Sequence, residues 1–149
     1  MTDDQKEAWK IATRLLSRRE YTGREIRQKL SKKGVQNEDA DIVLEALIKN
    51  GYQSDERFAE HFTRFRASKG YGPKRIRLEL KEKGVDAQLI EQGLEQAEVN
   101  WLERVAEVRE KKFKGQVADT WEEKNRQTRF LDYRGFTQEQ IDSCISNDE

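Results

Sequence analysis

The stretch from Tyr21 to Val35 reads YTGREIRQKLSKKGV, and the stretch from Tyr71 to Val85 reads YGPKRIRLELKEKGV. They lie 50 residues apart, align without a gap and are identical at seven of fifteen positions. A third, more diverged copy ends in FLDYRGF at residues 130–136, which keeps the leucine and the glycine. Self-similarity at a fixed period of this length is typical of repeat proteins, in which each repeat is one supersecondary unit.

Each copy predicts three helices, and the second shows the pattern most clearly. Ser54 is a favourable N-cap for a helix that opens with two acidic residues. Pro73 suits the first turn of the next helix, because its missing N–H needs no partner there. Gly84 predicts the end of that helix, and Asp86 can cap the third.

The other two copies have similar start and stop signals. Thr22 followed by Glu25, and Thr137 followed by Gln140, match the capping-box pattern. Asn37 is expected to cap the third helix of the first copy. The junction from Ala97 to Trp101 contains no glycine or proline, so either Asn100 caps a new helix or one longer helix runs through.

The apolar residues predict a set of small cores. Charged residues make up 39% of the chain and hydrophobic residues 34%, which fits several small cores better than one large core. Disorder is the alternative for so charged a chain, but apolar residues recur at helical spacing throughout. Phe58, Phe62 and Phe65 are expected to form a core face, as are Ile76 and Leu80.

We therefore predict an all-α fold of three tandem three-helix repeats that form an elongated, curved array. The expected domains are residues 1–51, 52–99 and 100–149. Because each repeat has its own small core and no long apolar stripe is left over, we expect a monomer.

Charge is balanced overall but is unevenly distributed. The chain has 29 basic and 29 acidic residues, yet residues 10–33 carry nine Lys or Arg against two Glu, and residues 57–83 carry nine against three. On the second copy's middle helix, 100° per residue places three cations together on one flank beside Ile76. The first copy places two arginines on the same flank. The candidate partner-binding or DNA-binding residues are Arg24, Arg27, Lys74, Arg77 and Lys81, with weaker support for Arg14, Arg64 and Lys69.

These cations have two possible roles, and the sequence leaves both open. They can bind DNA phosphates or acidic patches on a protein, and phosphate binding would be non-specific and salt-dependent. Alternatively they only solvate the helices and form i,i+4 pairs, as Arg75 can with Glu79.

Little in the sequence supports catalysis. His61 is the only histidine and has no nearby Cys or second His for a metal site. Cys144 lies on the apolar face of the last helix, which favours a buried structural thiol over a nucleophile. No phosphate-binding glycine-rich loop is present. We expect no cofactor, no metal and no enzymatic activity; the single cysteine suits a reducing cytoplasm, and no stretch is apolar enough to span a membrane.

The chain resembles the RecX family of bacterial regulators. The resemblance rests on Arg57-Phe58-Ala59, Gly72-Pro73, Arg75-Ile76 and the stretch from Leu80 to Gly84, and on the C-terminal sequence Tyr-Arg-Gly-Phe at 133–136. It covers nearly the whole chain, from about Trp9 to Ile145.

The resemblance implies a partner and an activity. RecX proteins bind within the groove of the RecA–DNA filament, limit its extension and lower its recombinase, ATPase and coprotease activities, so a role in DNA repair and the SOS response is expected. The alternative is a stand-alone helical protein that binds nucleic acid non-specifically and affects recombination indirectly. A sequence-specific reader would concentrate base-reaching side chains on one recognition helix, whereas here similar charge is spread over two repeats.

Overall fold

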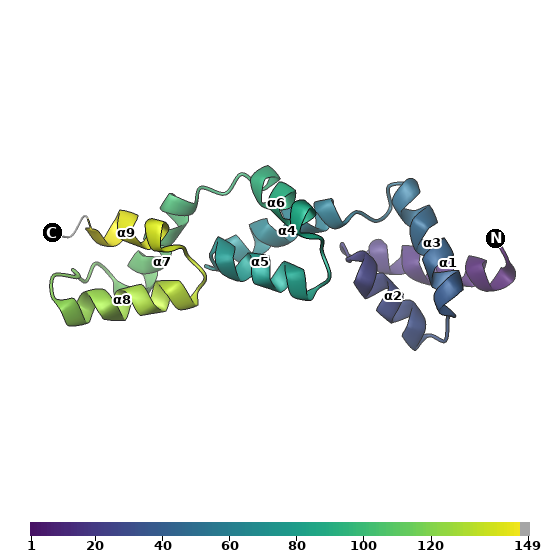
Figure 1. Cartoon of the computed structure of the whole chain (residues 1–149), viewed down its shortest axis with the longest axis horizontal. Coiled ribbons are helices and arrows are strands. Elements are labelled where there is room, and N and C mark those ends of the chain that lie inside the picture. The colour runs from purple at the N-terminus through teal and green to yellow at the C-terminus, as the bar shows by residue number, and fades with distance from the viewer. Residues whose placement is uncertain (147–149) are drawn as a thin grey trace. The chain divides into compact units, whose positions relative to one another are not determined.

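The computed structural model describes residues 1–146, and within that range the chain forms nine α-helices and no strand (Figure 1). The helices follow one another in three groups of three, as the repeat predicts. Their bounds are α1 (Asp3–Leu16), α2 (Gly23–Lys32), α3 (Asn37–Lys49), α4 (Asp55–Ser68), α5 (Pro73–Glu82), α6 (Ala87–Gln96), α7 (Trp101–Phe113), α8 (Trp121–Tyr133) and α9 (Gln138–Ile145).

Side-chain caps begin several helices where the sequence predicts them. Thr22 Oγ1 accepts the Glu25 N–H at 3.1 Å, and the Glu25 carboxylate accepts the Thr22 N–H at 3.0 Å. Thr137 and Gln140 make the same reciprocal pair at the start of α9. Both predicted capping boxes are therefore confirmed, and each satisfies two amide groups that the helix itself cannot pair.

The junction between the second and third repeats is a capped break. Asn100 Oδ1 accepts the Glu103 N–H at 3.1 Å, so α6 ends at Gln96 and a new helix begins at Trp101. Of the two possibilities that the sequence leaves open, the structure has the separate helix.

The predicted Asn37 cap is wrong by one position. Asn37 is the first residue of α3, and Gln36 stands at the cap without a side-chain hydrogen bond. Glu38 and Asp39 lie in the first turn instead. Their negative charges stabilise the positive end of the helix dipole, so a side-chain cap is less necessary here.

Glycines in the left-handed region end the middle helices. Gly34 has φ +87°, and the following Val35 N–H reaches back to the Leu30 carbonyl at 3.0 Å. Gly84 (φ +87°) and Gly135 (φ +101°) end α5 and α8 in the same way. This closing turn favours glycine because a side chain is strained at positive φ.

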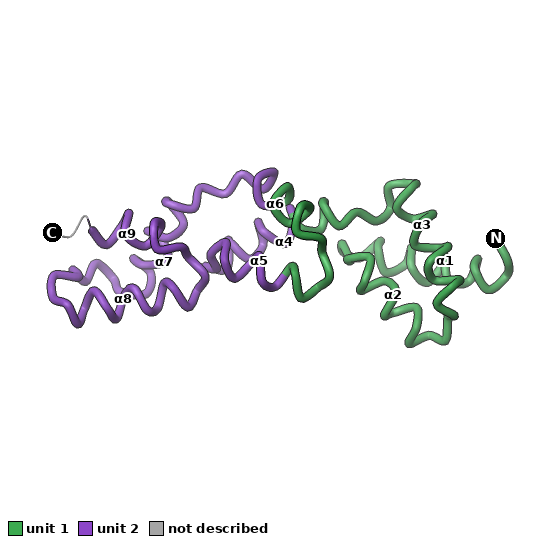
Figure 2. Tube along the Cα trace, in the orientation of Figure 1, with its two compact units in different colours: residues 1–59, 80–93 green, residues 60–79, 94–149 purple. Residues whose placement is uncertain are grey.

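The helices are divided between two compact units (Figure 2). Unit 1 comprises residues 1–59 and 80–93, and unit 2 comprises residues 60–79 and 94–149. The first repeat lies wholly in unit 1 and the third wholly in unit 2, whereas the middle repeat contributes segments to both.

The core of unit 1 lies between α1, α2 and α3. Two alanines one helical turn apart on α1 allow close packing of branched side chains from the other two helices. Its fully or almost fully buried residues include Ala8, Ala12, Ile26, Leu30, Val43 and Leu47.

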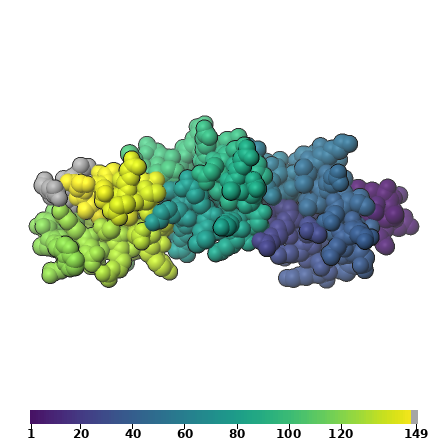
Figure 3. Space-filling model, in the orientation of Figure 1, coloured from purple at the N-terminus to yellow at the C-terminus, as the bar shows by residue number. Residues whose placement is uncertain are grey.

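A second core in unit 2 lies between α7, α8 and α9, and Figure 3 shows α8 and α9 packed together on one face. Its buried residues include Val105, Leu131, Phe136, Ile141 and Ile145. Cys144 packs against this core but is only partly buried, so the expectation of a buried thiol is met only in part.

The predicted phenylalanine face of α4 needs correction. Phe58 is buried and Phe62 is half-buried, but the Phe65 side chain is 58% exposed. The buried stripe of α4 passes instead through Ala59, Thr63 and Ala67. Residues four apart advance about 40° around a helix, so by its last turn the stripe has moved away from Phe65. Alanine and threonine give a weaker hydrophobic signal than phenylalanine, and for this reason the sequence pattern predicts the wrong buried face for the last turn of α4.

Candidate partner-binding surface

The middle helices of neighbouring repeats meet end to end, and this contact positions two of the predicted cations. In unit 1 the start of α2 meets the end of α5. Thr22 Oγ1 donates to the Lys83 carbonyl at 3.2 Å, and Arg24 Nη1 donates to the Glu82 carbonyl at 3.0 Å. We call this contact the first joint. Its side chains satisfy carbonyls at the end of α5 that have no partner within the helix.

A second joint, in unit 2, lies where the start of α5 meets the end of α8. Here backbone amides make the contact: Gly72 N–H donates to the Arg134 carbonyl at 2.8 Å, and Lys74 N–H to the Gly135 carbonyl at 2.9 Å. The approach is so close that a Cβ at Gly72 would lie 2.4 Å from the Gly135 carbonyl carbon.

Arg24 and Lys74 occupy matching positions at the two joints. Arg24 packs over Gly84, where an added Cβ would lie 2.6 Å from the Arg24 side chain. Lys74 Nζ pairs with the Asp132 carboxylate on α8 at 2.8 Å. Both side chains are exposed but already hold neighbouring repeats together. Any contact that Arg24 and Lys74 make with a partner would come in addition to this structural role.

The other three cations with stronger sequence support are exposed on their helices. Arg27 on α2 forms an ion pair with Asp41 at 2.8 Å, and both side chains are largely in solvent. Arg77 and Lys81 are exposed on α5. Because an exposed ion pair contributes little to stability, these side chains can exchange their present surroundings for a partner's acidic groups at low cost.

The three cations with weaker support are dispersed. Arg14 is exposed on α1. Arg64 on α4 pairs with Glu60 one turn earlier at 3.2 Å, as expected of a solvated surface, and also donates to the Gln96 carbonyl at the end of α6 at 3.4 Å. Lys69, by contrast, lines a cavity of unit 2 together with cations that the sequence analysis did not select.

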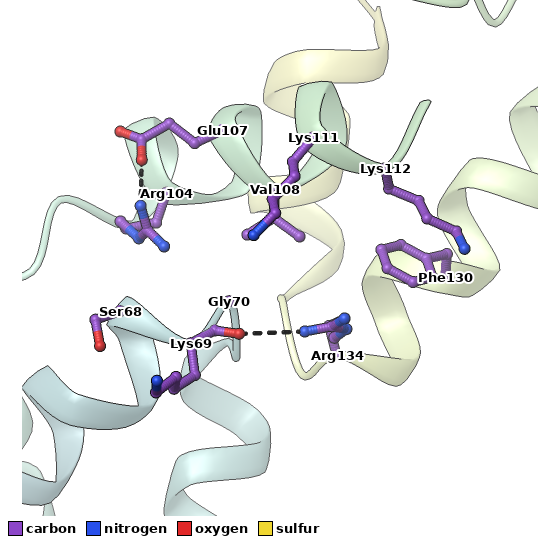
Figure 4. A pocket seen from close by; sticks show the side chains of 10 residues that line it. All are labelled: Ser68, Lys69, Gly70, Arg104, Glu107, Val108, Lys111, Lys112, Phe130 and Arg134. Carbon is purple, nitrogen blue, oxygen red and sulfur yellow. Dashed lines mark hydrogen bonds and ion pairs between the residues drawn. The ribbon is translucent and has the colours of Figure 1, made fainter. Parts of the chain in front are cut away.

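This cavity, the basic pocket, has a volume of about 600 Å³. Figure 4 shows α7 on one side of it and the ends of α4 and α8 on the other. Four residues with basic side chains join Lys69 in its lining, and Glu107 is the one acidic residue there. The added basic residues are Arg104, Lys111, Lys112 and Arg134.

Two arginines of the basic pocket are held in place by the end of α4. Arg104 donates to the Ala67 carbonyl at 2.8 Å and also pairs with Glu107. Arg134 donates to the Lys69 carbonyl at 3.3 Å, and its guanidinium lies 5.0 Å from the centre of the Tyr71 ring. Cations are favourable at a helix C-terminus because the helix dipole is negative there.

Sequence reasoning missed this pocket because its residues come from three helices in two repeats. A partial signal existed. Lys111 and Lys112 are adjacent in the last turn of α7, and Arg134 stands directly before the glycine that ends the middle helix of the third repeat. Their meeting with Lys69 depends on the second joint, which no local pattern shows.

Two pKa shifts occur near the start of α8. Hydrogen bonds from Arg126 and Gln127 lower the pKa of the Glu123 carboxyl. The hydrogen bond to Glu123 in turn raises the pKa of the Arg126 guanidinium. Both shifts move away from neutrality, whereas general acid–base groups are tuned toward it. His61 is exposed and lies 3.7 Å from Glu60. Among residues 1–146 no group of three His, Cys, Asp or Glu side chains could hold a metal ion, and no helix could cross a membrane.

The fold and its surface define a class of protein: an all-helical repeat protein made of three three-helix domains, with basic side chains on exposed helix faces and around a pocket. Comparison with known families gives the particular family. The first, second and third three-helix domains of RecX match residues 8–47, 54–94 and 98–145. The chain belongs to the RecX family.

Curated relatives agree over most of the chain. The regulatory protein RecX of Legionella pneumophila (strain Corby) is 45% identical over 134 residues, which cover 90% of this chain and 89% of the relative. That of Pseudomonas entomophila (strain L48) is 41% identical over 137 residues, which cover 92% and 88%.

A solved structure of similar fold is the crystal structure of RecX from Lactobacillus salivarius, with a TM-score of 0.82 over 99% of this chain and 97% of that one. Its sequence identity is 24%, so this likeness concerns the fold.

Proposed function

We propose that this protein binds the filament that the RecA recombinase forms on DNA and modulates it, mainly by inhibition. The affected properties would be filament extension, recombinase activity, ATPase activity and coprotease activity, in DNA repair and the SOS response. Membership of a family whose curated relatives are named regulatory proteins is the observation that carries the proposal. We propose a cytoplasmic, monomeric regulator that acts by binding and not as an enzyme, with domains at residues 1–51, 52–99 and 100–149.

The exposed basic flank supports a binding role. Arg27, Arg77 and Lys81 extend from middle helices of two successive repeats and are open to solvent. Cations in this arrangement can meet acidic patches of a protein filament or the phosphates of its DNA. Arg24 and Lys74 stand near them, but their bonds at the joints make them poor probes of partner binding.

The test is the DNA-dependent ATPase of pre-formed RecA filaments with this protein added at substoichiometric concentration. A fall in ATPase rate is expected. No effect, together with tight binding to bare DNA, would instead favour the stand-alone nucleic-acid-binding protein.

A charge-reversed variant then tests the flank. Replacing Arg27, Arg77 and Lys81 with Glu should weaken filament binding while helicity stays unchanged. The matched control reverses the same number of exposed charges on the first repeat, at Lys6, Lys10 and Lys49. If both variants lose affinity equally, net charge and not the flank controls binding.

A further inference from the structure

Helices α2 and α3, which pack against each other in unit 1 (Figure 1), form the two walls of an open groove with a volume of about 530 Å³. The α3 wall carries two apolar side chains, because Leu44 is half-buried and Ile48 is 53% exposed. These residues lie one helical turn apart, so their side chains form one stripe along the groove. The stripe lies beside the face of α3 that packs Val43 and Leu47 into the core.

The α2 wall of the groove is basic. Arg24 and Arg27 both line it, and their spacing of one turn places them on one side of the helix. Asp55 is the one acidic residue in the lining, and its carboxylate already accepts hydrogen bonds from the Gly23 N–H at 2.9 Å and from Gln53 at 2.8 Å. The groove therefore presents guanidinium groups opposite an apolar stripe.

An ion pair within the chain engages one of these guanidinium groups. Arg27 Nε lies 2.8 Å from a carboxylate oxygen of Asp41 on α3, so the pair joins the two walls. Asp41 lies on the same side of α3 as Leu44 and Ile48, which follow it at positions typical of one helix face. The Arg27 and Asp41 side chains are 47% and 59% exposed. Because an exposed pair contributes little to stability, another carboxylate can replace Asp41 at low cost.

We propose that this groove docks a segment of a partner protein in which an apolar side chain is flanked by acidic ones. The apolar side chain packs on Leu44 and Ile48, and the acidic side chains bind the two arginines of α2 in place of Asp41. Charge complementarity favours this occupant, since residues 10–33 carry nine Lys or Arg against two Glu. A DNA backbone would match the charge but would leave the apolar stripe in water, which is unfavourable.

The inference rests on the proposed function in that the RecA filament is the first partner to test. It adds the chemistry of the segment that docks, and it gives Asp41 the role of an internal competitor for that segment. A competitor of this kind has a distinctive consequence. Removing one carboxylate from this position should raise the affinity for the partner, whereas a purely structural ion pair would have no such effect.

The first test measures the affinity of the full chain for pre-formed RecA filaments by co-sedimentation. Ile48→Ala should bind about fivefold more weakly, because the variant loses apolar surface that the partner would cover. Asp41→Asn should bind about threefold more tightly, because the free energy of an exposed ion pair no longer opposes docking.

Each variant has a matched control in the same unit. Ile42→Ala removes an apolar side chain that is 46% exposed on the same helix but does not line the groove. It lies about 120° around α3 from Ile48. Glu7→Gln removes one exposed negative charge from α1. Both controls should bind filaments like the unmodified chain, and circular dichroism should show unchanged helicity in every variant.

A second measurement needs no recombinase. The isotope-labelled chain is titrated with a synthetic peptide of alternating glutamate and leucine, and separately with polyglutamate, while NMR spectra are recorded. The methyl signals of Leu44 and Ile48 should shift with the peptide and should respond much less to polyglutamate. Asp41→Asn should bind the peptide more tightly than Glu7→Gln does.

Two results would overturn the proposal. One is an Ile48→Ala variant that binds filaments as tightly as Ile42→Ala does. The other is a peptide titration in which the methyl signals of Leu44 and Ile48 stay in place, or in which polyglutamate shifts them equally. If the unmodified chain leaves the filament ATPase unchanged but the methyl signals shift with the peptide, the proposed function fails and the groove is still a docking site for an acidic, apolar segment.

Discussion

The two joints perform the same task with different chemistry. At the first joint, side chains at the start of α2 reach the carbonyls that end α5: the Thr22 hydroxyl and the Arg24 guanidinium. At the second joint, backbone amides at the start of α5 bond directly to carbonyls that end α8, through Gly72 and Lys74. Thr22 and Gly72 are equivalent positions of the repeat, as are Arg24 and Lys74, so the two joints use the same positions in different ways.

The difference explains how a repeat can diverge and still stack. A glycine at the second joint lets two backbones approach until amides and carbonyls pair, which brings the positive end of the α5 dipole to the negative end of the α8 dipole. A threonine at the first joint needs more room, and its hydroxyl bridges the gap. The α2 amide left over, on Gly23, finds the Asp55 carboxylate at 2.9 Å. The first joint can therefore be altered by changing side chains, whereas the second depends on backbone geometry.

The three glycines that end the middle helices provide the largest expected effects. Gly34, Gly84 and Gly135 all have positive φ, so alanine adds about 1 kcal/mol of backbone strain at each. Their surroundings differ. An alanine Cβ meets nothing within 4 Å at Gly34, the flexible Arg24 side chain at Gly84, and the Arg75 backbone nitrogen at 2.7 Å at Gly135.

The free energy of unfolding should consequently fall in a graded series. We expect losses of about 1 kcal/mol for Gly34→Ala, about 2 for Gly84→Ala and about 3 for Gly135→Ala, since crowding adds to strain. Urea unfolding followed by circular dichroism measures all three. Equal losses would mean that φ alone matters and that the second joint is not tightly packed.

Gly72→Ala tests the second joint without any positive φ. Its Cβ would lie 2.4 Å from the Phe136 nitrogen and 2.5 Å from the Gly135 carbonyl oxygen, both of them backbone atoms that cannot rotate away. We expect a loss of about 2 kcal/mol, as in other overpacked sites. The same urea titration measures it.

Gly23→Ala is the matched control at the first joint. The nearest atom to its Cβ would be a Leu44 methyl group at 3.4 Å, an ordinary contact distance. Alanine is also the better residue in a helix, so the control should leave stability within about 0.5 kcal/mol of the unmodified chain. A similar loss in both variants would contradict the distinction between the joints.

Much of the fold can be predicted from local signals. Thr22, Ser54, Asn100 and the helix-ending glycines act within a few residues of themselves, so capping and turn rules place most helix boundaries. The failures arise where distant residues decide. Phe65 is exposed because the core that α4 meets follows Ala59, Thr63 and Ala67, and nothing near Phe65 in the sequence shows this.

The arrangement of the candidate binding residues could be predicted only in part, for the same reason. A helical wheel finds Arg27, Arg77 and Lys81, which are exposed as expected, but it cannot show that Arg24 and Lys74 are engaged at the joints. The basic pocket needs Lys69 and Lys111, 42 residues apart in the chain, to lie on one cavity. That proximity is a product of the second joint, where the close approach of two glycines sets the position of α4 and α8 within unit 2.

Thr22→Ala has an expected effect as small as that of Gly34→Ala, and it shows whether the hydroxyl makes the first joint. The side chain is fully buried; its oxygen accepts the Glu25 N–H and donates to the Lys83 carbonyl. Alanine removes both bonds, and we expect a loss of about 1 kcal/mol in unfolding free energy. Thr22→Ser keeps the hydroxyl and should recover most of that loss. If serine is no better than alanine, the threonine methyl group and not the hydroxyl stabilises the first joint. The first joint would then depend on apolar packing, and the side-chain hydrogen bond would not be what distinguishes it from the second joint.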